Sequence, residues 1–546
     1  MRSLRGNPWV VLVVISLGFF MTLLDLTIVN IAIPNMITKL HASFDDVLWV
    51  INAYALVLAV LVITGGRLGD LIGPRAMFAG GVAVFTAASA ACGLAPSPGW
   101  LIAFRSVQGL GAAMLMPQTL AIITMIFPPE RRGAAFGIWG AVAGVATIAG
   151  PTLGGLLITA FDWRWIFYVN VPIGAVVLAL TGVLIPSLRS GRQHRMDYLG
   201  VVLASAALLA ICYGLVEGQT YNWGTITSFI SIPLVLGAGV VLMAAFLVVQ
   251  WLQQSREPLV PFSVFRDRNF ALMNFVSGTL VIGMMGIFLP FTIYLQSVLG
   301  FSALKAGLTM APSSLISVFI APLAGRWTDR IGGKYILIAG LTLFAGGMGW
   351  MFLIAQTNSQ WEIFLPALLV AGVGMGCTFA PLTTTAMRNV EPRMAGAASG
   401  VLNTVRQVGT VIGTAAVGAL LQNRLVAAWT TQATTQSRGL PSAVRAQFVT
   451  GFQNAAKSGL QVGAGQTGVS VKLPRGAPAG LLRQIETAGA DVFTHGFVTA
   501  MRATSIMPVA VMLLAAVSCF AIKRRKRTAE PAGTQATEAE TSSAQA

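Results

Sequence analysis

Runs of about 20 apolar residues, long enough to cross a bilayer, recur along this 546-residue chain and constrain its fold more than any other feature. Only 10% of the residues are charged, whereas soluble domains carry roughly 25%. The sequence therefore predicts an all-α polytopic membrane protein. We expect fourteen transmembrane helices, beginning near Trp9, Val47, Ala76, Trp100, Ala134, Ile166, Tyr198, Ile226, Phe270, Ala306, Tyr335, Ile363, Gly396 and Thr504.

The distribution of basic residues predicts the orientation. The net charge is +17, but Lys and Arg are spread over the loops instead of forming one face, so nucleic acid is not an expected partner. They gather on one side of the predicted membrane, and the short loops on the other side hold only Lys39, Arg164 and Lys305. Because basic loops stay in the cytoplasm, we expect both termini to be cytoplasmic and the chain to lie in the inner (cytoplasmic) membrane.

Chemistry other than transport finds little support in the sequence. The four cysteines lie in four different apolar runs, which disfavours disulfides and metal sites. All three histidines fall in loops, and no catalytic or phosphate-binding motif occurs. We therefore expect neither an enzyme nor a bound metal or cofactor, and the proton gradient is the expected energy source.

One ionisable residue, Asp25, lies inside the first apolar run, Trp9 to Ala32. A carboxylate at that depth is costly and persists mainly where it faces a bundle interior or a wet cavity. Asp25 therefore indicates an ion or substrate pathway, and a carboxylate hydrogen-bonded only for packing is the alternative.

An internal repeat predicts the architecture. The loop sequence GRLGDLIGPR (66–75) recurs as GRWTDRIGGK (325–334), and PERRGAAFG (129–137) recurs as PRMAGAASG (392–400). Two such pairs on the same side of the membrane predict two parallel six-helix halves that move about a site at their interface. We expect these halves at 1–186 and 270–527, two inserted helices at 187–269, and a disordered tail at 528–546.

Several motifs resemble those of the major facilitator superfamily, specifically its fourteen-helix drug:proton antiporter family 2. The motifs that carry the resemblance are LDLTIVNIAIP (24–34), GGRLGDLIGPR (65–75), LIAFRSVQGLGAA (101–113), GVATIAGPTLGG (144–155), WRWIFYVNVPIG (163–174) and NTVRQVGTVIGTA (403–415). The resemblance implies proton-coupled export (antiport) of lipophilic small molecules such as drugs, dyes or antibiotics. A dedicated exporter of one endogenous metabolite, antibiotic or lipid is the alternative, and a monomer is expected.

The resemblance also brings the first and fourth helices together. Asp25 and Arg105 then lie at similar depths, within about one helical turn. We expect them to form a pair whose opening and closing moves a proton, and a static bridge is the alternative. Asn30, Arg406 and Gln407 are expected to line the substrate cavity, although Arg406 is also compatible with helix packing. Because the later spans contain no deep acid, dications are less expected as substrates than monocations, zwitterions or neutral compounds.

The repeated loop is expected to act as a latch that favours the outward-open state. Its candidate residues are Gly66, Arg67, Asp70, Gly73, Arg75, Asp329 and Lys334. Asp70 has two expected kinds of donor, helix N-termini or the side chains of Arg131 and Arg132, and a solvated turn is the alternative.

The fifth span carries small residues that we expect to form one close-packing face, bent by the proline, that seals the pathway against leak. These residues are Gly140, Gly144, Gly150, Pro151, Gly154 and Gly155. The long outer loop, 422–502, is expected to hold short amphipathic helices or partial disorder.

Overall fold

A computed structural model describes residues 6–32, 35–36, 39–40, 42, 44–187, 196–218, 221, 223–254, 258–457 and 479–523. The first group of helices, which we call the N-terminal half, comprises α1 (Pro8–Ile28), η1 (Val29–Ala32), α3 (Phe44–Ile72), α4 (Pro74–Leu94), α5 (Pro98–Ile126), α6 (Arg132–Ala160), α7 (Trp165–Tyr168) and α8 (Asn170–Leu184).

The last group, which we call the C-terminal half, contains the longest helices. It comprises α12 (Arg268–Ile293), η2 (Tyr294–Val298), α13 (Ala303–Ile331), α14 (Gly333–Ile354), η3 (Trp361–Phe364), α15 (Leu365–Met387), η4 (Pro392–Met394), α16 (Ala395–Ser437), α17 (Ser442–Lys457), α18 (Ala479–Ser518) and η5 (Cys519–Ala521). The predicted domain limits themselves stay a prediction.

The elements between the halves are α9 (Tyr198–Glu217), β1 (Thr225–Thr227), β2 (Ile230–Ser231), α10 (Ile232–Leu252) and α11 (Ser263–Arg266). Helices α9 and α10 pack against each other, and α9 also contacts α3 and α16, one helix from each half. The span expected to begin near Ile226 begins instead at Ile232, because a short antiparallel hairpin of β1 and β2 precedes it.

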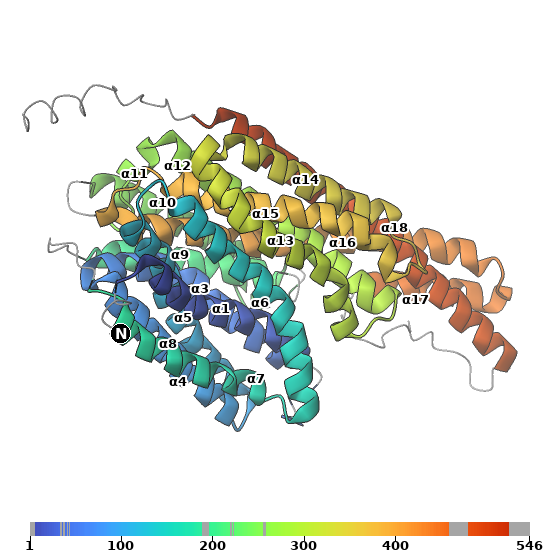
Figure 1. Cartoon of the computed structure of the whole chain (residues 1–546). Coiled ribbons are helices and arrows are strands. Elements are labelled where there is room, and N and C mark those ends of the chain that lie inside the picture. Colours follow the sequence, from blue (N-terminus) through green and yellow to red (C-terminus); the bar gives the residue numbers. More distant parts are fainter. Residues whose placement is uncertain are drawn as a thin grey trace, which may run out of the picture.

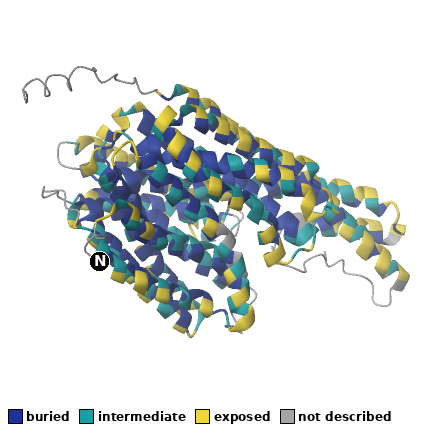
Figure 2. Cartoon of the chain, in the orientation of Figure 1, coloured by how far each residue is buried: buried dark blue, intermediate teal, exposed yellow. Residues whose placement is uncertain are grey.

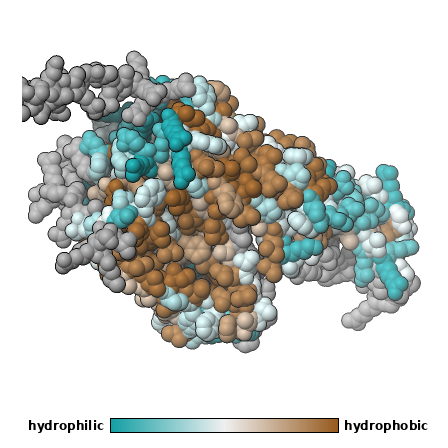
Figure 3. Space-filling model, in the orientation of Figure 1, coloured by the Kyte–Doolittle hydropathy of each residue, from teal (hydrophilic) through white to brown (hydrophobic). Residues whose placement is uncertain are grey.

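The prediction of a polytopic helical protein is confirmed. Thirteen helices of the described chain are long and apolar enough to cross a membrane. Helix α6, predicted as the fifth span, is a 29-residue helix outside that set, so the count of fourteen stays a prediction. An apolar band runs across the molecule, and hydrophilic residues gather at its two ends (Figure 3).

The repeated loops fold into matching turns. Gly73 ends α3 with φ 104°, and Gly332 ends α13 with φ 87°, both in the left-handed region that favours glycine. In each half the next helix starts at once, and Pro74 suits the first position of α4 because a proline there loses no intrahelical hydrogen bond. We call this end of the bundle, with Asp70 and Asp329, the latch end.

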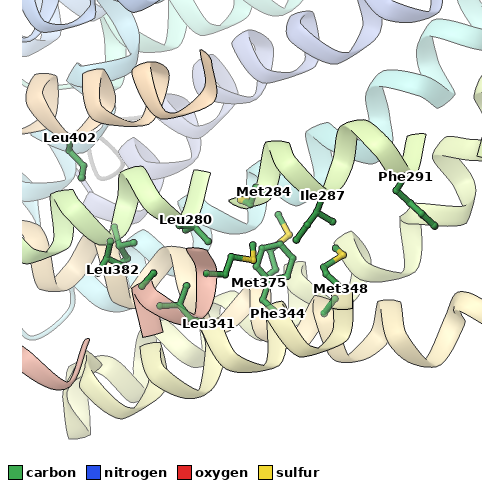
Figure 4. Packing of buried hydrophobic residues seen from close by; sticks show 14 of the residues in the cluster. Leu280, Met284, Ile287, Phe291, Leu341, Phe344, Met348, Met375, Leu382 and Leu402 are labelled. Atoms are coloured by element: carbon green, nitrogen blue, oxygen red, sulfur yellow. The ribbon is translucent and has the colours of Figure 1, made fainter. Parts of the chain in front are cut away.

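The interior of the bundle is buried and its outward faces are exposed (Figure 2). In the C-terminal half, Met284, Phe291, Phe344 and Met348 are all at most 9% exposed and pack together between α12 and α14 (Figure 4). The four cysteines are free and buried, as their positions in separate apolar runs predict.

The prediction for the outer loop is partly wrong. Helix α16 continues to Ser437 and α18 begins at Ala479, so both project beyond the bundle with α17 beside them (Figure 1). Trp429 of α16 packs on Phe452 of α17 and Phe493 of α18, with ring centroids 6.2 and 5.4 Å away. Only α17 fits the expectation of a short amphipathic helix, and residues 458–478 lie outside the described part.

Candidate functional site

Asp25 of α1 and Arg105 of α5 form an ion pair inside the N-terminal half, as their predicted depths allow. Arg105 Nη1 donates to Asp25 Oδ2. Asp25 is 0% exposed and Arg105 is 1% exposed. A buried pair of this kind is costly to break, because removal of one partner leaves the other charge uncompensated.

Three further polar residues complete the surroundings of Asp25, and the sequence analysis did not identify them. Gln108 Nε2 donates to Asp25 Oδ1 over 2.9 Å and to Ser89 Oγ over 3.1 Å. Asn170 Nδ2 lies 3.4 Å from Asp25 Oδ1 and 3.1 Å from Ser89 Oγ. Gln108 follows Arg105 by three residues, so helical periodicity offered a signal for it. Ser89 and Asn170 come from α4 and α8, and only the tertiary fold brings them here.

Arg105 has other partners that remain if Asp25 loses its charge. Its Nε donates to the carbonyl oxygen of Val50 over 3.0 Å, and its Nη1 donates to Gln108 Oε1 over 2.8 Å. Its guanidinium carbon lies 4.4 Å from the centroid of the Tyr54 ring, a cation–π contact. The site can therefore hold the Arg105 cation beside either a charged or a protonated Asp25.

The latch aspartates bind helix N-termini of the opposite half. Asp70 Oδ1 and Oδ2 accept from the backbone N–H groups of Gly396 and Ala397, both over 2.9 Å, at the start of α16. Of the two donors expected for Asp70, helix N-termini are therefore the ones observed.

Asp329 makes the matching contacts with the start of α6. Its Oδ1 and Oδ2 accept from Gly133 N over 2.8 Å and from Ala134 N over 3.0 Å. The two repeated motifs thus meet crosswise. In each half, the aspartate of the first motif (66–75 or 325–334) caps the helix that begins in the second motif of the other half (392–400 or 129–137). A carboxylate at a helix N-terminus is stabilised by the helix dipole and by charge-assisted hydrogen bonds.

Glycines permit this close approach between the halves. A Cβ on Gly66 would clash with the carbonyl oxygen of Gly396, and a Cβ on Gly325 would clash with that of Gly133. Gly137 lies against Ala321 in the same way. The sequence analysis found the repeated glycines at 133, 137, 396 and 400 but did not assign them to the latch.

Arg75 and Lys334, the last residues of the two latch loops, do not pair with the latch aspartates. Arg75 Nη2 donates to the carbonyl oxygen of Gly182 near the end of α8, and Lys334 Nζ donates to that of Phe520 in η5, both over 2.6 Å. Each therefore binds the last helix of its own half, where a cation is favourable near free carbonyl groups. Arg67 is the basic residue near Asp70, with Nη1 3.9 Å from Oδ2.

Asp70 is buried and Asp329 is half-buried, so a solvated turn does not describe the first loop. Arg132, an alternative donor for Asp70, binds elsewhere. Its guanidinium donates to the carbonyl oxygens of Thr124 over 2.6 Å and Arg388 over 3.3 Å, which ties the ends of α5 and α15 together across the halves.

The small residues of α6 form more than one packing face. Gly144 faces Ser314 and Val318 of α13, whereas Gly150 faces Thr27 of α1, and a Cβ on Gly140 would lie 3.7 Å from Phe379 of α15.

The expectation of one continuous face is therefore wrong. Gly155 is the clearest exception, because a Cβ there would meet nothing within 4 Å. Gly154 is buried, and the side chain of Pro151 lies outside the described part.

The expected cavity residues fall on α16 and η1. Arg406 Nε donates to Ser277 Oγ over 3.0 Å and its Nη2 donates to Thr383 Oγ1 over 3.1 Å. Gln407 is partly exposed beside it, and the side chain of Asn30 lies outside the described part.

Comparisons with known proteins agree with this architecture. The family model of the Major Facilitator Superfamily matches residues 15–414. The chain is 42% identical over 423 residues to an uncharacterized MFS-type transporter of Mycobacterium tuberculosis, covering 77% of this chain and 72% of that protein. It is 36% identical over 420 residues to the multidrug resistance protein Stp of the same species, covering 77% and 76%.

A further relative is the tetracenomycin C resistance and export protein of Streptomyces glaucescens, 34% identical over 426 residues, with 78% of each chain covered. Among solved structures, the human organic anion transporter MFSD10 aligns with a TM-score of 0.55 at 12% identity, covering 93% of this chain and 99% of that one, which shows the fold alone. The chain therefore belongs to the Major Facilitator Superfamily and is a multi-pass membrane transporter.

Proposed function

We propose that this transporter exports lipophilic small molecules, such as drugs, dyes or antibiotics, in exchange for protons. The observation that carries the proposal is the buried pair of Asp25 and Arg105, because an ionisable pair within membrane helices is costly and marks ion or substrate pathways. The relatives named for multidrug resistance and for tetracenomycin C resistance and export support export as the direction.

In this mechanism Asp25 is the proton carrier. When a proton binds Asp25, its ion pair with Arg105 is lost, and Val50, Gln108 and Tyr54 continue to hold the guanidinium. When Asp25 releases the proton, the pair forms again. Because every member of the site is almost fully buried, each exchange of the proton requires the helices to move.

The latch contacts hold the two halves together at one end, and so define one end state of that movement. Four hydrogen bonds to Asp70 and Asp329 join the halves at one end, and the charge bias predicts that this end faces the cytoplasm. We therefore propose that the described state is closed to the cytoplasm. We also propose that the protein is a monomer in the inner membrane with cytoplasmic termini, and that the proton gradient, without a bound cofactor, supplies its energy.

A dedicated exporter of one endogenous product is the second candidate, favoured by the relative named for tetracenomycin C export. Substrate breadth separates the two candidates. A strain that overexpresses the protein should gain resistance to several unrelated dyes and antibiotics if the first is right, and to one chemical family if the second is right.

Dye efflux under controlled energy supply tests the proton coupling. In cells whose ATP level is maintained, an uncoupler should stop extrusion of a fluorescent dye. Continued extrusion after the proton gradient has collapsed would contradict the proposal.

A further inference from the structure

Arg406 carries a positive charge in the C-terminal half that no carboxylate balances. It lies in the part of α16 that crosses the bundle, and within the described chain no Asp or Glu lies within ion-pair distance of it. This distinguishes it from Arg105, whose charge is balanced by Asp25. An unbalanced charge at this depth is costly, and it favours an incoming anion.

The neighbours of Arg406 orient its guanidinium without neutralising it. Ser277 of α12 and Thr383 of α15 accept hydrogen bonds from it through neutral hydroxyl groups, and both residues are 0% exposed. The ring centroid of Phe379 lies 5.9 Å from the guanidinium carbon. Three helices and an aromatic ring therefore hold the cation in a fixed position.

These two bonds use only part of the donors of a guanidinium group. Arg406 is partly exposed, and its nitrogens are not among the described side-chain atoms that are enclosed without a hydrogen-bond partner. Its Nη1, which makes neither of these hydrogen bonds, is therefore not fully enclosed by protein. Gln407, the next residue, is also partly exposed and adds an amide nearby.

Arg406 lies on α16 beyond two contacts that this helix makes with the N-terminal half. Ser399 Oγ donates to the carbonyl oxygen of Pro117 in α5 over 2.8 Å, and Gly400 lies against Ile63 of α3. Arg406 follows Gly400 by six residues, or about 9 Å along the helix away from the latch end. It therefore lies farther from the latch end than both of these contacts.

We propose that Arg406, positioned by Ser277 and Thr383, binds the carboxylate of an amphiphilic organic acid, so that substrates of this transporter include lipophilic molecules with one acidic group. The inference rests on the proposed function, since it names the substrate class of that exporter. A planar guanidinium binds a carboxylate through paired, charge-assisted hydrogen bonds, which an ester of the same molecule cannot match. The N-terminal half supplies the proton site and the C-terminal half supplies the contact for the acid.

A matched pair of dyes tests the inference by binding alone. Rhodamine 110 carries a free carboxylate, and rhodamine 123 is its methyl ester. With the purified full-length protein at neutral pH, fluorescence polarisation should show tighter binding of the acid than of the ester. Arg406→Gln should weaken binding of the acid by about tenfold or more and leave the ester within about twofold.

Two further variants separate a binding role from a structural one. Arg406→Lys keeps the charge but not the paired hydrogen bonds, so it should retain part of the preference for the acid. Arg424→Gln removes an exposed charge farther along α16 and should bind both dyes as the wild type does. The thermal unfolding midpoint of each variant checks that a loss of binding is not a loss of folding.

Several results would overturn the inference. One is that the wild-type protein does not bind the acid, or binds it no more tightly than the ester. Another is that Arg406→Gln weakens the binding of both dyes equally or changes the binding of neither. Transport in proteoliposomes is scored separately. Acid-selective binding that depends on Arg406, combined with no movement of dye under an imposed pH gradient, would contradict the proposed function and leave the assignment of Arg406 standing.

Discussion

The N-terminal half buries an ion pair among its helices, whereas the C-terminal half buries hydrocarbon and sulfur between α12 and α14. Around α1 and α5 the buried side chains include Asp25, Arg105 and Gln108, joined by hydrogen bonds. Between α12 and α14 the buried side chains are methionines and aromatic rings such as Met348 and Phe344 (Figure 4). Two copies of one helical pattern have thus acquired different side chains, and the proposed proton carrier, Asp25, lies in the first.

The latch shows the opposite relation, since there the halves are nearly alike. Asp70 and Asp329 make the same pair of backbone contacts with α16 and α6. They differ in that Asp70 is buried and Asp329 is half-buried. The two halves therefore differ in their buried side chains in the middle of the bundle and match in their contacts at the latch end.

The largest expected effect is that of Asp25→Asn on transport. The substitution removes the group that carries the proton, and it leaves Arg105 without its counter-charge, at a cost of about 3–5 kcal/mol. Proton-driven dye efflux should be abolished when assayed in proteoliposomes. Glu486→Gln, at an exposed position of α18, is the control and should transport normally. If Asp25→Asn transported dye at the wild-type rate, the assignment of proton coupling to the N-terminal half would be wrong.

A core truncation in the C-terminal half should lower stability without changing coupling. Phe344 is fully buried, so Phe344→Ala should lower the free energy of unfolding by about 3 kcal/mol. Leu343 is 40% exposed and serves as the control, because Leu343→Ala removes far fewer contacts. Unfolding in detergent measures both variants. If folded Phe344→Ala protein lost its dependence on the pH gradient, the division of roles between the halves would be wrong.

The latch substitutions should impair transport without preventing membrane insertion. Asp70→Asn loses charge-assisted hydrogen bonds worth about 1–3 kcal/mol in total, and Asp329→Asn should have a smaller effect because Asp329 is more exposed to solvent. Dye efflux, measured at matched expression levels, shows which of the two variants is more impaired. Unimpaired efflux in both variants would show that the crosswise contacts do not control the transport cycle.

The smallest expected effect concerns Asp162, at the end opposite the latch. Partial burial raises the pKa of its carboxyl, but hydrogen bonds from Lys39 and from the backbone N–H of Trp163 outweigh that and hold the pKa below its usual value. The contact with Lys39, at 3.1 Å, is largely exposed. Asp162→Asn should therefore cost under about 1 kcal/mol at neutral pH.

The pH dependence of that small effect has a definite sign. A depressed pKa in the folded state stabilises the protein fully above the ordinary carboxyl pKa of about 4. The difference between Asp162→Asn and wild type should therefore shrink as the pH falls below that value and vanish below the folded-state pKa of Asp162. Unfolding midpoints across that range measure it, and a difference that grew on acidification would contradict this reading of the contact.

Most of the transmembrane helices were predictable, because membrane helices can be recognised in a sequence by their length and hydropathy. Asp25 stood out because a charge inside such a run is rare. The crosswise latch was harder to predict. The repeats showed that Gly66 matches Gly325 and that Gly133 matches Gly396, but not that one motif of each half meets the other motif of the opposite half.

Two misses have a physical explanation in tertiary packing. Asn170 is polar at the start of a helix, where a structural cap is an equally good explanation. Only the approach of α8 to α1 and α4 places it by Asp25 and Ser89. The extension of α16 past its apolar part is rich in Thr and Gln, which lowers its hydropathy. Contacts of Trp429 with Phe452 and Phe493, distant in sequence, accompany its helical structure there.

Substrate-stimulated proton movement is the most direct measurement of the central claim. Proteoliposomes that contain the protein and a trapped pH-sensitive dye are given a transported substrate on one side, with no ATP present. The account predicts that substrate drives protons in the opposite direction in the wild type and that Asp25→Asn shows no such movement. Substrate transport without proton movement in the wild type, or equal proton movement in Asp25→Asn, would contradict it.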